Sequence, residues 1–389
     1  MIRQHLLPLA VATAAGLFSS NLHAGPAPAT LREAFADDFL IGAALNRSVV
    51  SGSNARSAEL AAKQFSTLTA ENDMKWQSIH PQPERFDFTA ADAYLAFAEK
   101  HKMAVIGHTL VWHSQTPGWV FQGENGQPPT REVLLQRMRD HIRTVVGRYK
   151  GKVKGWDVVN EALADGGPQI LRDSPWRRSI GDDFIEQAFR FAHEADPRAE
   201  LYYNDYGLEN PHKRRKAVDL LRGLIDRKVP VSGVGTQSHI QLNHPPIAEV
   251  EQTIKDFAAL GLKVMVTELD VDVLPSRGPA GNADISRREQ GDASLNPYKE
   301  GLPDDVQQKL AQRYGELFAV YLRHSQSLTR VTFWGLDDGQ SWLNGFPIRG
   351  RTNHPLLFDR RQEPKPAFAA VLKAGIESRG GRAPVRPAR

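Results

Sequence analysis

The sequence predicts a single α/β domain built as a (β/α)8 barrel of the TIM type, and two observations carry this prediction. First, eight short apolar runs of strand type alternate along the chain with longer amphipathic runs, and such alternation is typical of a parallel sheet. Second, the apolar runs end in polar or aromatic residues, as expected where the carboxyl ends of barrel strands surround one mouth. Eight repeated units favour a closed barrel over an open, doubly wound sheet.

Periodicity places the elements of this barrel in order. The expected strands are 39–45, 67–72, 104–112, 155–161, 200–206, 233–240, 263–271 and 330–336. The expected helices between them include 90–101, 131–149, 182–195, 214–226 and 247–260. Apolar residues of the second helix fall mostly on one stripe, and Thr89 with Asp92 indicates the start of the first. Residues 275–303, rich in Gly, Pro, Asn and Asp, are expected to form a long loop after the seventh strand.

The composition excludes several classes of function. The 389 residues contain no cysteine, so disulfides, thiolate metal sites and a cysteine nucleophile are ruled out. The formal net charge of +4 is small and diffuse. Because no basic stripe with interleaved aromatic residues occurs, we do not expect the chain to bind nucleic acid.

The two ends of the chain differ from the predicted barrel. Arg3 precedes an apolar run over residues 6–18 and then small residues ending at Ala24. Because this run is too short to span a bilayer, we expect residues 1–24 to be a cleaved signal peptide and the mature protein to be secreted to the periplasm or the medium. Residues 25–378 then form the barrel domain, and residues 379–389 form a disordered basic tail. No later segment is apolar enough to span a membrane, and we expect a monomer.

Two carboxylates follow apolar strands on opposite sides of the predicted barrel. Glu161 ends the stretch Gly-Trp-Asp-Val-Val-Asn-Glu, and Glu268 ends Val-Met-Val-Thr-Glu. A single Glu is more often a surface or salt-bridging residue, but a position directly after an apolar strand weakens that interpretation. Glycoside hydrolysis requires such a pair, since one acid protonates the leaving oxygen while the other carboxylate attacks or activates water.

Seven stretches at the predicted strand ends carry a family resemblance. They are Thr-Ala-Glu-Asn-Asp-Met-Lys-Trp (69–76), Gly-His-Thr-Leu-Val-Trp-His (107–113), Trp-Asp-Val-Val-Asn-Glu (156–161), Tyr-Asn-Asp-Tyr (203–206), Thr-Gln-Ser-His-Ile (236–240), Thr-Glu-Leu-Asp (267–270) and Thr-Phe-Trp-Gly (332–335). In this order they closely resemble the family 10 glycoside hydrolases, the xylanases, from about residue 31 to about residue 373. The resemblance implies a retaining enzyme that hydrolyses internal β-1,4-xylosidic bonds, with Glu161 as acid/base and Glu268 as nucleophile.

The resemblance also implies how a xylan chain or xylo-oligosaccharide would be held. Glu71, Asn72 and Lys75 correspond to the polar grip on the sugar next to the cleaved one. His108 and Asn160 correspond to partners for hydroxyls of the sugar that is cleaved. These are the polar edges of the expected substrate site.

Aromatic residues would form the walls of that site. Trp112, Trp334 and Trp342 correspond to the aromatic walls of the donor subsites, and Tyr206 to a residue that stacks a sugar on the leaving-group side. Sugar rings have apolar faces and polar edges, so aromatic faces beside polar groups suit them. Taken alone, each Trp could equally belong to the core.

The remaining correspondences concern the nucleophile. Gln237 and His239 flank it, and His239 with Asp270 resembles the His–Asp pair that tunes it in the family. We therefore expect the charge on Glu268 to raise the pKa of Glu161, and His239 to keep Glu268 ionised.

Other functions remain possible at this point. The same scaffold could carry another β-1,4-glycanase or an aryl-glycosidase, or a carbohydrate-binding protein without catalysis, although the presence of both glutamates argues against the last. His108, His113 and His239 could suggest a metal site, but their spacing is not that of zinc ligands. We therefore expect neither a metal nor a cofactor.

Overall fold

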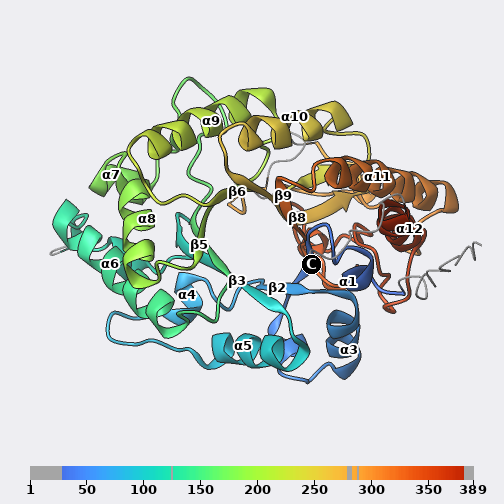
Figure 1. Ribbon diagram of the computed structural model, residues 1–389, viewed down its shortest axis with the longest axis horizontal. Coiled ribbons are helices and arrows are strands. Elements are labelled where there is room, and N and C mark those ends of the chain that lie inside the picture. The colour runs from blue at the N-terminus through green and yellow to red at the C-terminus, as the bar shows by residue number, and fades with distance from the viewer. Residues whose placement is uncertain (1–28, 124–125, 278–282, 287–288, 381–389) are drawn as a thin grey trace, which may run out of the picture.

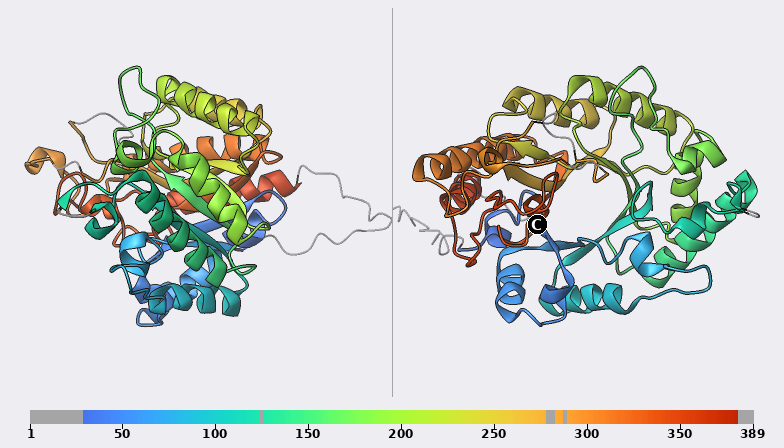
Figure 2. Two further views of the ribbon diagram at one scale, coloured as in Figure 1. Left: turned by 90° about the vertical axis from the view of Figure 1, so that its left-hand side faces the viewer. Right: turned by 180° about the vertical axis from the view of Figure 1, so that it is seen from behind.

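A closed ring of eight parallel strands forms the centre of the molecule, and helices surround it (Figure 1). The computed structural model describes residues 29–380 except 124–125, 278–282 and 287–288. Neighbouring strands pair in the order β6-β5-β4-β3-β2-β1-β9-β8, and the pairing of β6 with β8 closes the ring. The (β/α)8 barrel predicted from the sequence is confirmed, and the two turned views show helices on all sides of it (Figure 2).

The elements have the following bounds. The strands are β1 Leu40–Leu45, β2 Thr67–Ala70, β3 Ala104–Trp112, β4 Gly155–Asn160, β5 Glu200–Asp205, β6 Gly233–Thr236, β7 His239–Gln241, β8 Lys263–Asp272 and β9 Leu328–Phe333. The helices are α1 Leu31–Ala34, α2 Arg47–Val50, α3 Ala55–Gln64, α4 Trp76–Ile79, α5 Thr89–His101, α6 Arg131–Arg148, α7 Pro175–Ile180, α8 Phe184–Ala195, α9 Pro211–Asp226, α10 Ile247–Ala258, α11 Asp304–Arg323 and α12 Pro366–Gly380. Short 3-10 turns occur at η1 Gly118–Phe121, η3 Ala293–Leu295 and η4 Trp342–Asn344.

The barrel strands are buried on both faces, because helices cover the outside and side chains fill the inside. Every residue of β2 and of β4 is buried. Ile106, Tyr202 and Met265, from three different strands, pack together as a small separate cluster. A Cβ on Gly155 would lie 2.5 Å from the Tyr202 hydroxyl oxygen, so this position requires glycine. The cluster links β3, β5 and β8.

The sixth expected strand, 233–240, is two strands in the structure. β6 ends at Thr236 and β7 begins at His239, because Ser238 between them has a left-handed backbone with a φ of 59°. Both strands pair with β8. The last expected strand lies earlier than predicted, at Leu328–Phe333, and the other strands agree with prediction to within two residues.

The start of α5 differs in detail from its prediction. The helix begins at Thr89, one residue before its expected first residue, and its N-cap is Phe88, with no side chain capping it directly. Asp87 Oδ1 instead accepts a hydrogen bond from the Thr89 backbone N–H at 3.1 Å. Asp92, expected to mark the helix start, pairs with Arg148 of α6.

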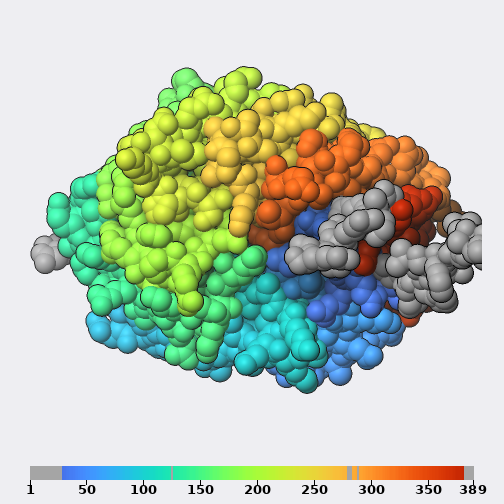
Figure 3. Space-filling model, viewed as in Figure 1, coloured from blue at the N-terminus to red at the C-terminus, as the bar shows by residue number. Residues whose placement is uncertain are grey.

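The first and last helices of the described chain lie against each other. Figure 3 shows the C-terminal part of the chain, in orange and red, lying against the N-terminal part in blue. Arg379 lies in α12 and donates a hydrogen bond to the Glu33 backbone oxygen. The prediction that the disordered tail begins at residue 379 was therefore wrong for Arg379 and Gly380, which are helical because the helix docks on α1. The rest of that tail and the expected signal peptide lie outside the described residues.

None of the helices in the described ranges is long and apolar enough to cross a bilayer.

Candidate active site

A pocket at the strand ends of the barrel holds most of the residues that the sequence singled out. Its lining consists of Glu71, Asn72, Lys75, His108, Trp112, Gln115, Asn160, Glu161, Gln237, His239, Glu268, Ala283, Ile285, Trp334 and Trp342. Of the predicted site residues, only Asp270 and Tyr206 do not line it. The lining side chains come from the carboxyl ends of several strands and the segments after them, which is where a barrel gathers reactive groups.

Glu161 follows β4 and is almost fully buried. Trp112 Nε1 donates to its Oε2 at 2.7 Å, and Gln237 Nε2 donates to its Oε1 at 2.9 Å. Burial raises the pKa of Glu161 to about 7, with smaller contributions in the same direction from the charges of Asp205 and then Glu268. The expected rise in pKa is present, but burial and Asp205 contribute more to it than the expected partner Glu268.

Glu268 lies in β8 and is also buried. Asn204 Nδ2 donates to its Oε1 at 2.8 Å, and His239 Nε2 lies 3.3 Å from its Oε2. Burial alone would raise the pKa of Glu268, but the hydrogen bond from His239 and the charges around it outweigh burial and lower this pKa. At a pH below about 7, the two buried carboxyl groups of this pocket therefore differ in protonation, with the proton held by Glu161.

His239 carries a positive charge in this arrangement. Its Nδ1 forms an ion pair with Asp270 Oδ1 at 3.0 Å. Burial alone would lower the pKa of His239, but Asp270 and then Glu268 outweigh it and raise the pKa to about 10. Asp270 also accepts a hydrogen bond from Trp342 Nε1 at 2.8 Å. Asp270 thus lies behind the pocket, where it links the imidazolium to an aromatic wall.

Asn204 is a member of the site that residue-by-residue prediction missed. It lies in β5 and is fully buried. Besides Glu268, its Nδ2 donates to Asn160 Oδ1 at 2.9 Å, and Gln237 Nε2 lies 3.3 Å from the same Asn160 oxygen. The side-chain amides of Asn160, Asn204 and Gln237 therefore form a hydrogen-bonded chain between Glu161 and Glu268. The sequence feature that could have identified Asn204 was its position near the end of a predicted strand.

A second polar group lies in the same pocket, around Lys75. Lys75 Nζ donates to Asn72 Oδ1 at 3.0 Å and to Gln115 Oε1 at 2.8 Å. The same ammonium lies 5.0 Å from the centre of the Trp112 ring. Burial lowers the pKa of Lys75 and raises that of Glu71. Gln115 was not predicted, because it lies in a loop beyond β3 where no strand pattern marks it.

Aromatic rings close the pocket around His108. Asp157 Oδ2 lies 2.9 Å from His108 Nδ1, which leaves Nε2 as the ring nitrogen that could meet a sugar hydroxyl. Trp334 lies edge-to-face on His108 with ring centroids 5.3 Å apart. Trp342 is stacked on Phe346 at 4.5 Å, so both tryptophans have fixed orientations.

Tyr206 does not enter the pocket. Its side chain is buried, with Lys213 Nζ 3.4 Å from the ring centre. Its hydroxyl donates to Asp165 at 2.7 Å and accepts from Arg172 at 2.6 Å. One face of the ring is therefore covered by a cation, and the expectation that Tyr206 stacks a sugar has no support in this geometry.

The segment after β8 reaches the site, as its length suggested. Ala283 and Ile285, from the expected loop 275–303, line the pocket. Arg172 Nη1 pairs with Asp284 Oδ2 at 3.1 Å, so the loop is tied to the cluster around Tyr206.

No group of three or more His, Asp or Glu side chains within the described ranges is arranged to hold a metal ion. His113, the third histidine considered as a ligand, has its pKa lowered to about 4, chiefly by burial.

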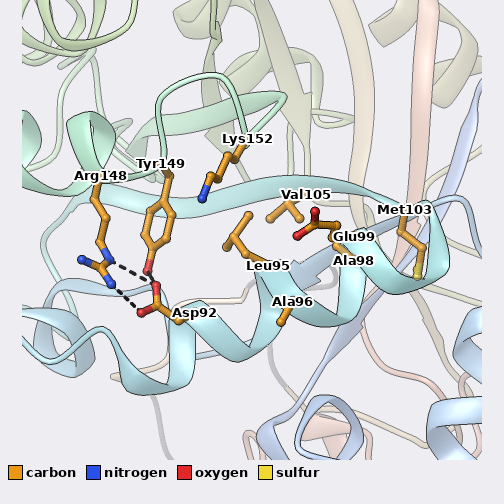
Figure 4. A pocket seen from close by; sticks show the side chains of 10 residues that line it. All are labelled: Asp92, Leu95, Ala96, Ala98, Glu99, Met103, Val105, Arg148, Tyr149 and Lys152. Atoms are coloured by element: carbon orange, nitrogen blue, oxygen red, sulfur yellow. Dashed lines mark hydrogen bonds and ion pairs between the residues drawn. The ribbon is translucent and has the colours of Figure 1, made fainter.

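A second pocket, with a volume of about 630 Å³, lies away from the mouth (Figure 4). It is a groove between α5 and the end of α6, with Leu95 and Val105 among its apolar lining. Val105 is near the start of β3, so the groove lies at the amino-terminal end of the barrel. Arg148 and Tyr149 both bind Asp92 there, which accounts for the polar groups at one end of the groove.

Comparisons with known proteins point to one family. The sequence model of glycosyl hydrolase family 10 matches residues 30–374. The chain is 45% identical over 344 residues to Endo-1,4-beta-xylanase A of Xylanibacter ruminicola, covering 88% of this chain and 93% of that protein. It is 43% identical over 343 residues to Endo-1,4-beta-xylanase of Geobacillus stearothermophilus, covering 88% and 98% respectively.

Solved structures give the same result. A family 10 endoxylanase retrieved from a sugarcane soil metagenome superposes with a TM-score of 0.86 at 45% identity, covering 88% of this chain and 99% of that one. The matched region contains the whole barrel and the whole pocket lining, and it coincides with the extent of the resemblance seen in the motifs. The chain belongs to glycosyl hydrolase family 10.

Proposed function

We propose that the chain is an endo-1,4-β-xylanase that retains anomeric configuration, with Glu161 as acid/base and Glu268 as nucleophile. One observation carries the assignment of roles: the two buried carboxyl groups have different partners. Glu161 accepts hydrogen bonds from the neutral Trp112 and Gln237 and has its pKa raised to about 7, whereas Glu268 lies 3.3 Å from His239 Nε2 and has its pKa lowered. A retaining enzyme needs one protonated acid and one ionised nucleophile at the start of the reaction. Relatives named endo-1,4-beta-xylanase support the choice of substrate.

The first step forms a covalent intermediate. A Glu268 carboxylate oxygen attacks the anomeric carbon while the bond from that carbon to the glycosidic oxygen breaks. Glu161 gives its proton to the departing oxygen, which leaves as a hydroxyl on the released part of the chain. The hydrogen bonds that Trp112 and Gln237 donate to Glu161 hold its carboxyl group in place for this proton transfer.

The second step releases the sugar. Glu161, now ionised, removes a proton from water, and the water oxygen attacks the anomeric carbon from the face that the leaving group vacated. The bond to Glu268 breaks, and its carboxylate is regenerated with Glu161 again protonated. Two inversions at one carbon give net retention. The donors Asn204 and His239 stabilise the carboxylate charge each time it reappears.

The remaining predicted site residues would bind the donor sugars. Lys75 with Asn72 and Glu71 offers an ammonium, an amide and a carboxyl group to sugar hydroxyls, next to Trp112 and Trp342. Polar edges beside aromatic faces suit a pyranose ring, and such contacts position the scissile bond.

Release of reducing ends from xylan and from carboxymethylcellulose tests the proposal. A xylanase releases them from xylan much faster than from the cellulose derivative. Faster cleavage of the cellulose derivative would indicate another β-1,4-glycanase, and turnover of aryl glycosides alone an aryl-glycosidase. If the unaltered protein binds xylan but hydrolyses none of these substrates, it is a carbohydrate-binding protein without catalysis.

We further propose that residues 1–24 direct secretion and are removed. The composition of the first segment supports secretion: Arg3, then an apolar run, then small residues up to Ala24. Mass spectrometry of enzyme recovered from the periplasm and the medium tests this. The expected N-terminus is Gly25, and an intact Met1 in all active fractions would contradict it.

A further inference from the structure

Glu209 lies outside the pocket lining, between β5 and α9, and is buried. One of its carboxyl oxygens, Oε1, accepts two hydroxyl hydrogen bonds. Thr236 Oγ1 donates to it at 2.7 Å, and Ser238 Oγ donates at 2.6 Å. These two hydroxyls come from the residues on either side of Gln237, so a single carboxyl oxygen bridges the break between β6 and β7.

That break has an unfavourable backbone. Ser238 has a φ of 59°, and a non-glycine residue in the left-handed region costs roughly 1–2 kcal/mol. Interactions of the surrounding structure must hold such a conformation. Side chains of successive residues alternate between faces, so Thr236 and Ser238 share the side of Glu209, and their two hydrogen bonds hold this alternation across the left-handed Ser238.

The break positions groups on both catalytic carboxyls. Gln237 Nε2 donates to Glu161 Oε1 at 2.9 Å, while His239 Nε2 lies 3.3 Å from Glu268 Oε2. The backbone of Gln237 is also anchored, since the Glu268 N–H donates to its carbonyl oxygen at 2.9 Å. Gln237 and His239 both line the pocket, so their common direction is kept across the left-handed Ser238.

We propose that Glu209 is a positioning residue for the reaction: by binding Thr236 and Ser238 it fixes the β6–β7 break that brings Gln237 to Glu161 and His239 to Glu268. This inference rests on the proposed function, because it takes Glu161 and Glu268 as the reacting groups. Glu209 acts through its neighbours and contacts neither the substrate site nor either carboxyl group.

The pH profile separates positioning from mere stabilisation. The hydrogen bond from Gln237 lowers the pKa of Glu161, and the bond from His239 lowers that of Glu268. Loosening the break weakens both bonds, so both pKa values rise and both limbs of the bell-shaped profile move to higher pH. A residue that only stabilised the fold would lower the melting temperature and leave both limbs in place.

The experiment compares kcat/KM for an aryl β-xylobioside across pH, together with Tm, for Glu209→Ala, Glu209→Gln, Thr236→Val and Ser238→Ala. Glu209→Ala should lose about tenfold to a hundredfold, as expected when hydrogen bonds to charged groups are disturbed, with both limbs moved upward. Glu209→Gln keeps an amide oxygen as acceptor and should recover most of this loss. Thr67→Val, which removes a buried strand hydroxyl bonded to the Ala104 oxygen, is the matched control and should leave both limbs in place.

Unmoved limbs in Glu209→Ala would overturn the proposal, as would Glu209→Gln losing as much as Glu209→Ala. If Glu209→Ala does not fold, the two hydroxyl variants decide in its place, and unmoved limbs in both overturn the proposal. Failure of the proposed function has a different signature: the unaltered enzyme would then not release reducing ends from xylan. Ratios between the variants and the unaltered enzyme on the aryl substrate do not depend on that result.

Discussion

The side-chain amide of Asn204 donates a hydrogen bond to Glu268 Oε1 at 2.8 Å. Its orientation is fixed from the other side, because Thr267 Oγ1 donates to its Oδ1 at 2.6 Å. An amide whose oxygen already accepts from a hydroxyl must turn its nitrogen toward the carboxyl group. Asn204 is therefore a preset donor to the proposed nucleophile, and it needs no reorganisation when the charge on Glu268 returns.

Replacing Asn204 with Ala should raise the pKa of Glu268, since this hydrogen bond helps to lower it. The acidic limb of the kcat/KM profile should then move to higher pH, and kcat/KM at its optimum should fall about tenfold to a hundredfold, the size of about 1.5–3 kcal/mol. Thr267→Val removes the orienting hydroxyl, which also lies 3.2 Å from the Thr236 backbone oxygen, and leaves the Asn204 donor in place, so it should give a smaller change in the same direction. An acidic limb that stays in place would show that Asn204 is not a donor to the nucleophile.

The two glutamates show how much of the site the sequence alone predicts. Glu161 and Glu268 each follow an apolar strand, and strand ends converge in any barrel, so their meeting could be predicted without coordinates. The split of the sixth strand could not, because it depends on the Ser238 backbone and its bond to Glu209, a residue from another part of the chain. Strand patterns describe alternation within one segment and contain no information on such a partner.

Tyr206 shows the same limit at the level of a side chain. Its position at the end of a strand favours a place in the site, but Lys213 of α9 covers its ring and Arg172 binds its hydroxyl. Gln115 is the opposite case, since it lies in the pocket without any strand pattern to mark it. Helices and loops decide which strand-end residues remain accessible, and their side-chain directions do not follow from periodicity.

The activity should decline as pH rises through about 7 in the free enzyme, since the pKa of Glu161 is raised to about 7 and only the protonated acid can donate. Glu161→Gln cannot ionise, so this basic limb should disappear from its residual activity on a substrate with a good leaving group. The kcat/KM profile of both proteins measures this. A basic limb unchanged in the variant would assign the acid to another residue.

Lys75→Ala should affect long substrates more than short ones. Lys75 with Asn72 and Gln115 would bind the second donor sugar, so its loss should lower kcat/KM for xylo-oligosaccharides by about tenfold to a hundredfold, as for a lost bond to a charged group. An aryl xyloside that leaves this subsite empty should lose less than about threefold, because no such bond is made. Gln115→Ala keeps the Lys75 ammonium, so its loss of kcat/KM for xylo-oligosaccharides should lie between these two values. Equal losses on both substrates would make Lys75 structural.

A buried histidine pair predicts loss of stability in acid. His80 and His141 approach through their Nδ1 atoms at 3.3 Å, and His141 is stacked on Trp76 at 3.7 Å. Burial lowers the pKa of both, and for His141 it does so strongly. With folded-state pKa values below the unfolded value, the unfolded chain binds more protons, so stability is full above about pH 6.5 and declines as the pH falls below it.

Replacing His141 with Phe keeps the stacked ring and removes one of these titrations. The free energy of unfolding from urea titrations should then depend less on pH below about 6.5, by up to about 1.4 kcal/mol per pH unit for one proton. His193→Phe, on the surface side of α8, provides a control and should leave the slope unchanged. The same slope in His141→Phe as in the unaltered protein would show that the pair does not control acid stability.

Azide separates the roles of the two glutamates by the stereochemistry of its product. In Glu161→Ala with an aryl xylobioside whose leaving group is already good, protonation is barely needed, so the covalent intermediate should form quickly and accumulate. Azide needs no base and should enter the vacated space and restore turnover. Because it attacks the face opposite Glu268, its product should be the β-glycosyl azide. Proton NMR of the product gives the configuration.

In Glu268→Ala the same reagent should give the opposite product. No covalent intermediate can form, and azide would occupy the space left by the nucleophile. It would attack the anomeric carbon of the β-linked substrate once, while Glu161 still protonates the leaving oxygen, so a single inversion should yield the α-glycosyl azide. Each variant is thus the control for the other under one set of conditions. If Glu161→Ala gave the α-azide and Glu268→Ala the β-azide, the proposed roles of the two residues would be exchanged.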